Sequence, residues 1–426
     1  MKIRLEEYDK NILKLFSGTA IAQAVSFILV PVIAKQYGPS EYGIYAAFVA
    51  AISVLSILST GKYELAIMLP EKQSEVVSLM NLSYSINLLV SSIIAILMVF
   101  LPITTLNWMF GIEANNRIFF LIIPLATYLI GAFQTLNYWL VREKQFNVLS
   151  LNKILRSVLF GLFAIILGYI WPQALYLAIS LTLSHLFSNI FLRIKLRGVN
   201  INARAMFSNQ GFNDLKDVAV KYIKFPSYIL PAEFMNVVCA QLPVFVFLWV
   251  FNPTESGYFS FILTVLNIPI SLLAGAILDV FKERAAKDYR ETGSCREAYN
   301  QTLKKMLLIA VVPFIILFFI GDELIVFFFG DKWAGAGKFL EIMLIMFFFK
   351  FISSPLSFIF YIVNKQKEDF LWHIYIFLST SFVLYMGAIY FKDILLTLKL
   401  YSINFSIIYL IYLLRSYQLS KKEIAL

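Results

Sequence analysis

The sequence predicts an all-helical integral membrane protein with about twelve transmembrane helices, arranged as two parallel halves of six. Three observations lead to this fold class. Apolar residues make up 60% of the 426-residue chain and aromatic residues 16%, with a mean hydropathy of +0.77, which far exceeds the balance of a soluble domain. The apolar residues form uninterrupted runs of membrane-crossing length. A short motif from the first half of the chain returns in the second half.

A helix of roughly 20 apolar residues crosses about 30 Å of hydrocarbon, and the chain contains twelve runs of about this length. In chain order they are Ile12 to Ala34, Tyr42 to Leu65, Val76 to Leu101, Phe119 to Leu140, Ile154 to Ile170, Gln173 to Leu192, Pro226 to Val250, Gly257 to Phe281, Met306 to Phe328, Phe339 to Val363, Phe370 to Phe391 and Ile394 to Leu414.

A repeated heptapeptide indicates the two halves. Residues 39–45, Pro-Ser-Glu-Tyr-Gly-Ile-Tyr, return as residues 253–259, Pro-Thr-Glu-Ser-Gly-Tyr-Phe, each time before an apolar run. Gly61 and Gly275 keep the same register, and Phe110-Gly111 is matched by Phe329-Gly330. Because each half holds six runs, both halves have the same sense in the membrane, which is typical of transporters built from parallel repeats.

Each copy of the heptapeptide is expected to start a helix, with Ser40 or Thr254 as the cap and the following Glu at the positive end of the helix dipole. The boundary between the halves is a basic, polar stretch without apolar periodicity. We therefore expect an N-terminal six-helix bundle over residues 1–195, a cytoplasmic linker over residues 196–221 and a C-terminal six-helix bundle over residues 222–426.

The distribution of positive charge predicts the orientation. Most of the 36 Lys and Arg residues lie at the termini and in the even-numbered loops, and positively charged short loops stay in the cytoplasm. Both termini are therefore expected to be cytoplasmic. The net charge of +10 is spread over short loops, so it favours membrane orientation and anionic lipid over nucleic acid as a partner. The odd-numbered loops hold Lys35, Arg117, Lys332, Lys338, Lys392 and Lys399.

The chain lacks the motifs of an enzyme. His185 and His373 lie in different runs without metal-ligand spacing, and no phosphate-binding Gly-x-x-x-x-Gly-Lys-Ser/Thr sequence occurs. Cys239 and Cys295 are too few for a disulfide framework or a metal site. We expect no catalysis, no metal and no cofactor, and whether a proton gradient, a sodium gradient or the membrane potential supplies the energy stays open.

Ionisable and polar side chains inside the runs are the candidates for a substrate cavity, because they are costly in lipid unless they face protein or water. Glu233 shares a helix face with Asn236 and Gln241. Lys350 lies near the middle of its run, where an ion pair with Glu233 is the competing structural interpretation. Further candidates are Gln23, Asn87 and Gln134, whose alternative role is hydrogen bonding between helices.

A second set of candidates lies near the predicted cytoplasmic mouth, where a charged headgroup would enter. Lys62 and Glu64 follow the second run, and Asp279 closes the corresponding run of the second half. Arg142, Lys153 and Arg156 bracket the connection between the fourth and fifth runs, where their positive charge suits a phosphorylated headgroup. The alternative for these basic residues is an ordinary cytoplasmic loop.

Two stretches carry a family resemblance. Residues 61–71, Gly-Lys-Tyr-Glu-Leu-Ala-Ile-Met-Leu-Pro-Glu, and residues 140–146, Leu-Val-Arg-Glu-Lys-Gln-Phe, resemble the polysaccharide transporters, the O-antigen and capsule repeat-unit flippases of Wzx type. The Tyr-Gly-Pro-Ser-Glu-Tyr-Gly turn at residues 37–43 is also typical of that family. The wider superfamily includes multidrug extruders and the lipid II flippase.

The resemblance implies two six-helix bundles around a central cavity in the bacterial inner membrane. It implies that the chain flips an undecaprenyl-pyrophosphate-linked oligosaccharide from the cytoplasmic to the periplasmic leaflet, with the bilayer, a polysaccharide polymerase and chain-length proteins as partners. Lys350 is then the expected interior cation, and Lys62, Arg142 and Arg156 are expected where the headgroup enters.

Two alternatives remain. A cation-coupled multidrug or small-molecule exporter of the same superfamily would need acidic groups, and Glu233 keeps it open. A membrane glycosyltransferase or O-antigen polymerase would be expected to show a large periplasmic loop or an acidic catalytic motif, which the sequence does not show.

Overall fold

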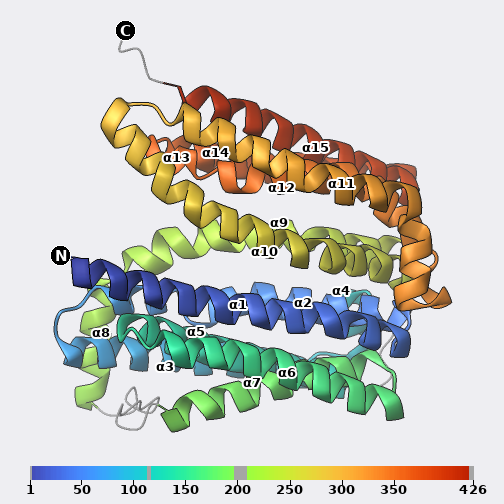
Figure 1. Ribbon diagram of the computed structural model, residues 1–426. Coiled ribbons are helices and arrows are strands. Elements are labelled where there is room, and N and C mark those ends of the chain that lie inside the picture. The colour runs from blue at the N-terminus through green and yellow to red at the C-terminus, as the bar shows by residue number, and fades with distance from the viewer. Residues whose placement is uncertain (1, 113–116, 196–208, 422–426) are drawn as a thin grey trace. The chain divides into compact units, whose positions relative to one another are not determined.

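The computed structural model describes residues 2–112, 117–195 and 209–421, and their side chains except those of residues 2–17, 209–211, 366 and 370. Within this part of the chain all regular structure is helical (Figure 1). Among the described residues twelve helices are long and apolar enough to cross a membrane, and each of them overlaps one of the predicted runs. The prediction of an all-helical membrane protein is confirmed.

The chain forms two compact units. The first unit contains the residues up to Tyr37 and Ile44–Gln241, and the second contains Gly38–Gly43 and Leu242–Leu426. Two helices, α2 (Pro39–Ser59) and α9 (Leu230–Val250), contribute to both units. The other helices of the first unit are α1 (Lys2–Gln36), η1 (Tyr63–Met68), α3 (Gln73–Phe100), α4 (Ile103–Phe110), α5 (Ile118–Arg142), α6 (Phe146–Ile170), α7 (Ala174–Lys195), α8 (Asn209–Lys221) and the π-helical turn η3 (Phe225–Ile229).

In the first unit α5 lies between α3 and α7, and α6 packs against both α7 and α1. Figure 1 shows the blue α1 running beside the green α6. One apolar core joins the ends of α3 and α5 to η1, with Tyr63, Met80, Leu136 and Trp139 among its buried side chains. This core fixes the short η1 segment against two membrane helices.

The predicted linker is partly helical. Residues 209–221 form α8, and its Leu215 and Val218 are buried in the same core as Tyr63 of η1. This amphipathic packing extends the first compact unit beyond the predicted boundary, as far as Gln241. The rest of the predicted linker, residues 196–208, lies outside the described residues.

The second unit is organised around α12 (Ala336–Leu356), which packs against α10, α11 and α15. The helix α14 packs against α15 and the π-helical turn η5. The helices of this unit are α10 (Pro253–Thr292), α11 (Arg296–Phe329), η4 (Asp331–Trp333), α12, α13 (Ile359–Ile362), α14 (Gln366–Leu384), η5 (Tyr385–Phe391) and α15 (Ile394–Leu419).

The two copies of the repeated heptapeptide lie against each other in the second unit. α2 begins at Pro39 and α10 begins at Pro253. A Cβ on Gly43 would collide with the carbonyl oxygen of Pro253, and a Cβ on Gly257 would collide with that of Pro39. The contact is reciprocal, as expected for copies of one element, and it requires glycine at both positions because backbone meets backbone.

The local structure differs from the prediction in two details. The residue that caps α10 is Asn252, whose side-chain oxygen accepts a hydrogen bond from the Glu255 amide at 3.0 Å, so Thr254 lies inside the first turn. Gly61 has a φ of 61° in the turn after α2, whereas Gly275 lies within α10. The second helix of the repeat stops at this position in the first half and continues to Thr292 in the second.

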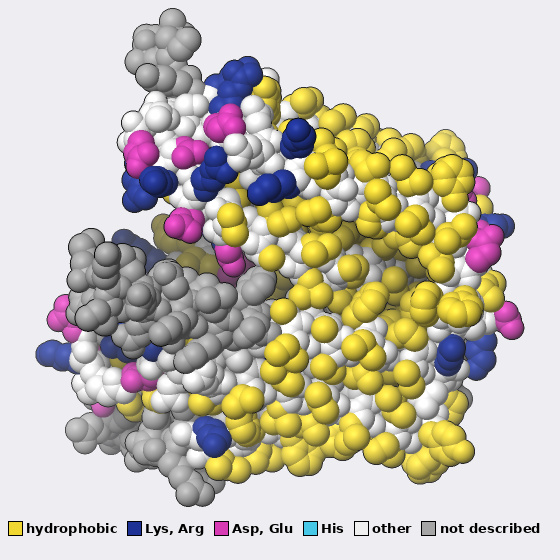
Figure 2. Space-filling model, viewed as in Figure 1, with side chains coloured by type: hydrophobic (Ala, Val, Ile, Leu, Met, Phe, Trp, Pro, Cys, Tyr) yellow, Lys and Arg dark blue, Asp and Glu magenta, His cyan; other side chains and the backbone are white. Residues whose placement is uncertain are grey.

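The surface has the composition expected for lipid contact. In Figure 2 hydrophobic side chains cover a broad part of the visible face, and charged side chains gather outside it. Phe100, Tyr169 and Phe319 are 80%, 87% and 73% exposed, which is unfavourable in water over so wide an area. The expected environment of these side chains is hydrocarbon or its interface.

Candidate functional site

The strongest candidate site lies in the first unit, where the chain leaves α2 and enters η1. Gly61 and Lys62 both have left-handed backbone angles, with φ values of 61° and 62°. Such a conformation costs a lysine roughly 1–2 kcal/mol. The turn gives Lys62 a position in which its side chain is only 8% exposed.

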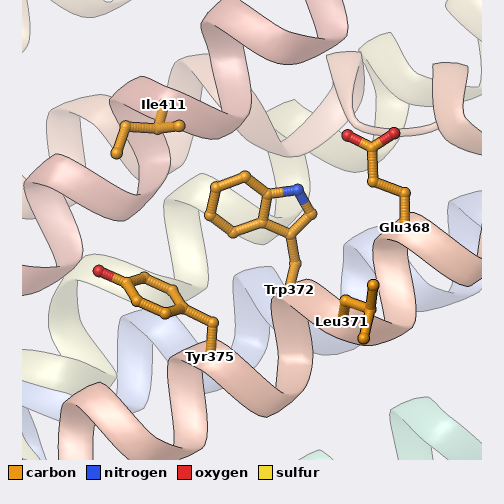
Figure 3. Close-up of a pocket in the computed structure, with 5 residues that line it drawn as sticks. All are labelled: Glu368, Leu371, Trp372, Tyr375 and Ile411. Carbon is orange, nitrogen blue, oxygen red and sulfur yellow. The ribbon is translucent and has the colours of Figure 1, made fainter.

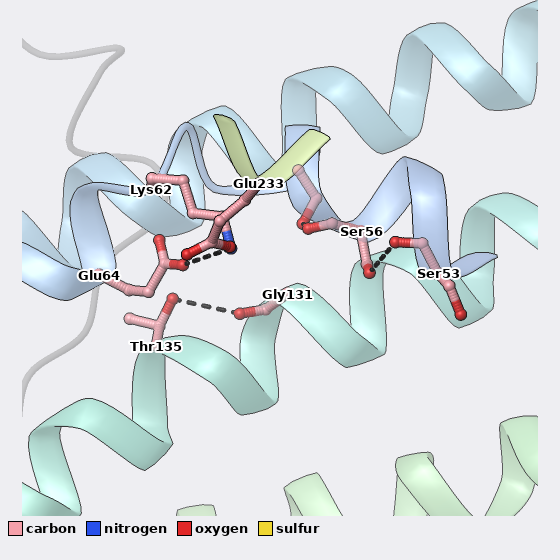
Figure 4. A network of polar contacts seen from close by, with 8 residues as sticks. Ser53, Ser56, Lys62, Glu64, Gly131, Thr135 and Glu233 are labelled. Carbon is pink, nitrogen blue, oxygen red and sulfur yellow. Dashed lines mark hydrogen bonds and ion pairs between the residues drawn. The ribbon is translucent and has the colours of Figure 1, made fainter. Parts of the chain in front are cut away.

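Three charged side chains meet there, and we call them the Lys62 cluster. The Nζ of Lys62 lies 2.5 Å from Oε2 of Glu233 and 3.8 Å from Oε1 of Glu64. Figure 4 shows both carboxylates directed at the lysine, Glu64 from η1 and Glu233 from α9. The sequence predicted Lys62 and Glu64 where a headgroup enters and Glu233 in a cavity, and the structure brings all three together.

The two carboxylates have different surroundings. Glu64 is 1% exposed, whereas the side chain of Glu233 is 43% exposed. Burial raises the pKa of the Glu64 carboxyl above its ordinary value, and the nearby Lys62 ammonium only partly opposes this shift. Within the described residues the Oε2 atom of Glu64 has no hydrogen-bond partner. The cluster therefore holds one carboxyl that is almost fully buried and one carboxylate with access to solvent.

The η1 segment that carries the cluster is held from two sides. Arg142, at the end of α5, donates hydrogen bonds to the carbonyl oxygens of Ile67 and Pro70 at 2.9 and 2.5 Å. The Tyr63 hydroxyl donates to the carbonyl of Ala219 in α8 at 3.1 Å. The predicted headgroup residue Arg142 thus has a structural role here, because backbone carbonyls occupy its guanidinium.

A row of hydroxyl groups along α2 leads to the cluster, and sequence reasoning missed it. Ser53, Ser56 and Ser59 are spaced three residues apart, and each hydroxyl donates to a carbonyl of the preceding turn at 2.6, 3.1 and 2.7 Å. The three-residue spacing of these serines is the sequence pattern that could have predicted the row. On α5 a Cβ at Gly131 would lie 2.5 Å from Ser59 Oγ, so glycine at this position leaves room for the serine face of α2.

The interior of the first unit holds further polar groups. The Asn87 amide donates to the carbonyl of Tyr128 at 2.8 Å, but Asn87 Oδ1 and Gln134 Oε1 have no partner among the described residues. In the same part of the chain Asn152 Nδ2, His185 Nδ1 and Asn189 Oδ1 also lack partners. Unpaired polar atoms are costly when buried without water, and these positions are suited to hydrogen bonds with water or a polar ligand.

The remaining basic candidates of the first unit, Lys153 and Arg156, each contact a different neutral side chain. Lys153 Nζ donates to the Thr19 hydroxyl at 3.0 Å. The Arg156 guanidinium lies over the Phe133 ring, 5.0 Å from its centroid. Both side chains are half-buried on α6 and are neutralised by no carboxylate of the described side chains. Gln23 is half-buried on α1.

The predicted interior cation of the second unit has a neutral partner. Lys350 Nζ donates to Asn267 Oδ1 at 2.7 Å and lies 5.1 Å from the Phe347 ring centroid. The sequence left open an ion pair between Glu233 and Lys350. In the structure Glu233 pairs with Lys62 and Lys350 pairs with Asn267. Asp279 is exposed and lies 3.6 Å from Lys282. On α9, Asn236 is exposed and Gln241 half-buried.

A shallow pocket of about 360 Å³ lies between α14 and α15 of the second unit. Trp372 and Tyr375 of α14 face Ile411 of α15 across it (Figure 3). Glu368, at its polar edge, accepts two hydrogen bonds from Arg415 at 2.6 and 3.0 Å. The described residues contain no group of three His, Cys, Asp or Glu side chains placed to hold a metal ion.

Comparison with known proteins gives a consistent picture. The profile of a family described as polysaccharide biosynthesis protein matches residues 19–338. Among solved structures, the chain is similar to the lipid II flippase MurJ in an inward closed conformation, with a TM-score of 0.74 and 16% identity over 95% of this chain and 90% of that one.

Multidrug transporters are also similar to this chain. An inward-facing multidrug resistance MATE family transporter of the MOP superfamily has a TM-score of 0.63 and 15% identity, over 95% of this chain and 96% of that one. MATE in complex with MaL6 has a TM-score of 0.60 and 13% identity, over 96% and 95%. Identities this low show a shared fold alone. No curated protein matches the chain.

Proposed function

Because this chain belongs to the polysaccharide biosynthesis protein family and shares its fold with flippases and exporters, we propose that it is a flippase for lipid-linked oligosaccharides. It carries repeat units linked to undecaprenyl pyrophosphate from the cytoplasmic to the periplasmic leaflet by alternating access. The product feeds the synthesis of O-antigen, capsule or exopolysaccharide. The proposed location is the bacterial inner membrane, with both termini in the cytoplasm.

The observation that carries this proposal is the buried Lys62 cluster within a membrane-helix fold. The diphosphate and sugars of such a substrate cannot enter hydrocarbon, whereas its polyprenyl tail can remain there. A flippase must therefore offer positive charge and hydrogen-bonding groups inside an otherwise apolar protein. The first unit offers a buried ammonium group, a row of hydroxyls on α2 and amide oxygens of Asn87 and Gln134 that have no partner within the described part of the chain.

In this proposal the chain transports its substrate without changing it. The energy comes from a proton gradient, a sodium gradient or the membrane potential, or from consumption of the flipped product. Since polymerisation follows flipping, a polysaccharide polymerase and chain-length proteins are the proposed partners on the product side.

The proposal is tested by the leaflet that holds the lipid-linked oligosaccharide in cells with and without this chain. A periplasm-restricted enzyme or label reads the outer leaflet only. We expect the oligosaccharide to accumulate on the cytoplasmic side without the chain and to return to the periplasmic side when the gene is restored. An unchanged distribution, with polymer still made, would contradict the proposal.

One observation favours a second function, a cation-coupled exporter of small molecules. Glu64 and Glu233 outnumber the single lysine of the cluster, and carboxylates are what a cationic substrate requires. This alternative predicts that cells with the chain tolerate cationic drugs better than cells without it. It also predicts no change in the distribution of the lipid-linked oligosaccharide.

A further inference from the structure

We infer that Glu233 is the built-in occupant of an anion site on Lys62, and that a diphosphate headgroup replaces it there. The inference rests on the proposed function and specifies how the same site binds its substrate. In the empty protein the glutamate neutralises the lysine. In the loaded protein the glutamate turns toward water and phosphate oxygens take its place.

The first argument is the unequal exposure of the two carboxylates. Glu64 is 1% exposed and lies in η1, two positions after Lys62 in the sequence. Glu233 has a side chain that is 43% exposed, and it comes from a different helix. An ionised group that already contacts solvent loses little when its partner is taken away, whereas a buried one loses much. Glu233 is therefore the partner that can leave.

The second argument is that Lys62 cannot move into solvent together with Glu233. Lys62 is fixed by consecutive left-handed residues, and the segment after it is tied by Arg142 to two carbonyls and by Tyr63 to α8. The side chain of Lys62 is 8% exposed, and among the described residues it keeps only the longer, 3.8 Å contact with Glu64 once Glu233 has left, which is unfavourable for a buried ammonium group. Departure of Glu233 thus requires that another anion arrive, so the two steps are linked as an exchange.

The third argument identifies the arriving anion as a phosphate oxyanion. The site offers the three donor hydrogens of Lys62, whose Nζ lies 2.5 Å from the Glu233 oxygen that would leave. A buried ammonium group suits a diphosphate, which carries more charge and more acceptor oxygens than the carboxylate that it replaces.

The experiment measures the affinity of the purified full-length chain in detergent for farnesyl diphosphate, a short water-soluble polyprenyl diphosphate. The variant Glu233→Gln removes the competing carboxylate, and we expect it to bind at least about tenfold more tightly than the unaltered protein, since a 1.4 kcal/mol competition equals a factor of ten. Lys62→Gln should weaken binding by a similar factor, and Lys62→Arg should retain it.

A matched control is Glu75→Gln. Glu75 is also a glutamate of the first unit, but its carboxylate accepts from Lys221 and Tyr222 and so belongs to a different ion pair from that of Glu233. Its replacement should leave the affinity unchanged. If Glu233→Gln binds no more tightly than Glu75→Gln, the exchange of Glu233 for a diphosphate is refuted. The proposed flippase function would still hold if the chain changes the leaflet distribution of the lipid-linked oligosaccharide.

Three further ligands identify the source of the anion. Inorganic pyrophosphate should compete with farnesyl diphosphate, and farnesol should not, because the site recognises the charged group. Phosphatidylglycerol in mixed micelles should compete weakly, since it carries a single phosphodiester charge. Equal competition by phosphatidylglycerol or by farnesol would overturn the assignment to a diphosphate. Loss of farnesyl diphosphate binding in every variant, together with an unchanged leaflet distribution in cells, would overturn the proposed function itself.

Discussion

Replacing Gly43 by alanine tests the close contact between the start of α2 and the start of α10. A Cβ on Gly43 would collide with the carbonyl oxygen of Pro253 and would lie 2.8 Å from the Gly257 amide nitrogen. These are backbone atoms of α10, so no side-chain rotation can relieve the overlap. The two helix starts must move apart, and the packing around them must follow.

The expected cost follows from this geometry. Adding one methyl group to a packed interior costs typically about 1–3 kcal/mol, and we expect about 2–3 kcal/mol because rigid backbone receives the methyl group. Gly257→Ala should cost the same, since its Cβ would meet the carbonyl of Pro39. The double variant should cost less than the sum of the two, because the first methyl group already opens the gap that the second requires.

Thermal unfolding of the purified protein measures the cost. Cys239 and Cys295 are buried cysteines, so a thiol-reactive dye reports their exposure on heating. Gly275→Ala is the control, because a Cβ there meets nothing within 4 Å and alanine favours a helix by about 0.5–1 kcal/mol. If Gly43→Ala unfolds at the same temperature as Gly275→Ala, the account of this close contact is wrong.

Three further predictions concern charged groups. Because burial raises the pKa of the Glu64 carboxyl, the folded protein should lose stability as pH rises above the ordinary glutamate range. Glu64→Gln should therefore flatten the pH dependence of the unfolding temperature above the ordinary glutamate pKa, and an unchanged slope would contradict this. Arg142→Lys cannot reproduce both hydrogen bonds to the carbonyls of Ile67 in η1 and Pro70 after it, so it should cost about 1.5–3 kcal/mol and speed proteolysis there. An unchanged rate of proteolysis would contradict the structural role of Arg142. Lys350→Ala should lower flipping of the lipid-linked oligosaccharide while its amount in the membrane stays constant, and full transport would make Lys350 structural.

The membrane fold could be predicted because its cause lies in the chain itself. Each crossing helix needs its own apolar run, and each of the twelve runs became a helix. The repeated heptapeptide also marked real helix starts at Pro39 and Pro253. The amphipathic α8 was harder to predict, because a short helix takes its stability from the core that it joins, here through Leu215 and Val218.

The candidate site was only partly predictable. Burial cost singled out Glu233 and Lys350, and the position of Lys62 near the predicted cytoplasmic mouth drew attention to that residue. The pairing of Lys62 with Glu233 depends on the left-handed turn and on the approach of α9 to η1, and no local pattern encodes that approach. Asn267, the partner of Lys350, was missed because a lone amide in an apolar run resembles any other interhelical contact.

The most direct test of the central claim is flipping by the purified chain alone in proteoliposomes. A fluorescently labelled oligosaccharide linked to undecaprenyl pyrophosphate is placed in both leaflets, and a membrane-impermeant quencher reports the fraction facing outward. We predict that this chain exposes the inner pool to the quencher and that Lys62→Gln exposes far less of it. A protected inner pool with the unaltered chain, in liposomes that carry the ion gradients and the membrane potential, would contradict the account.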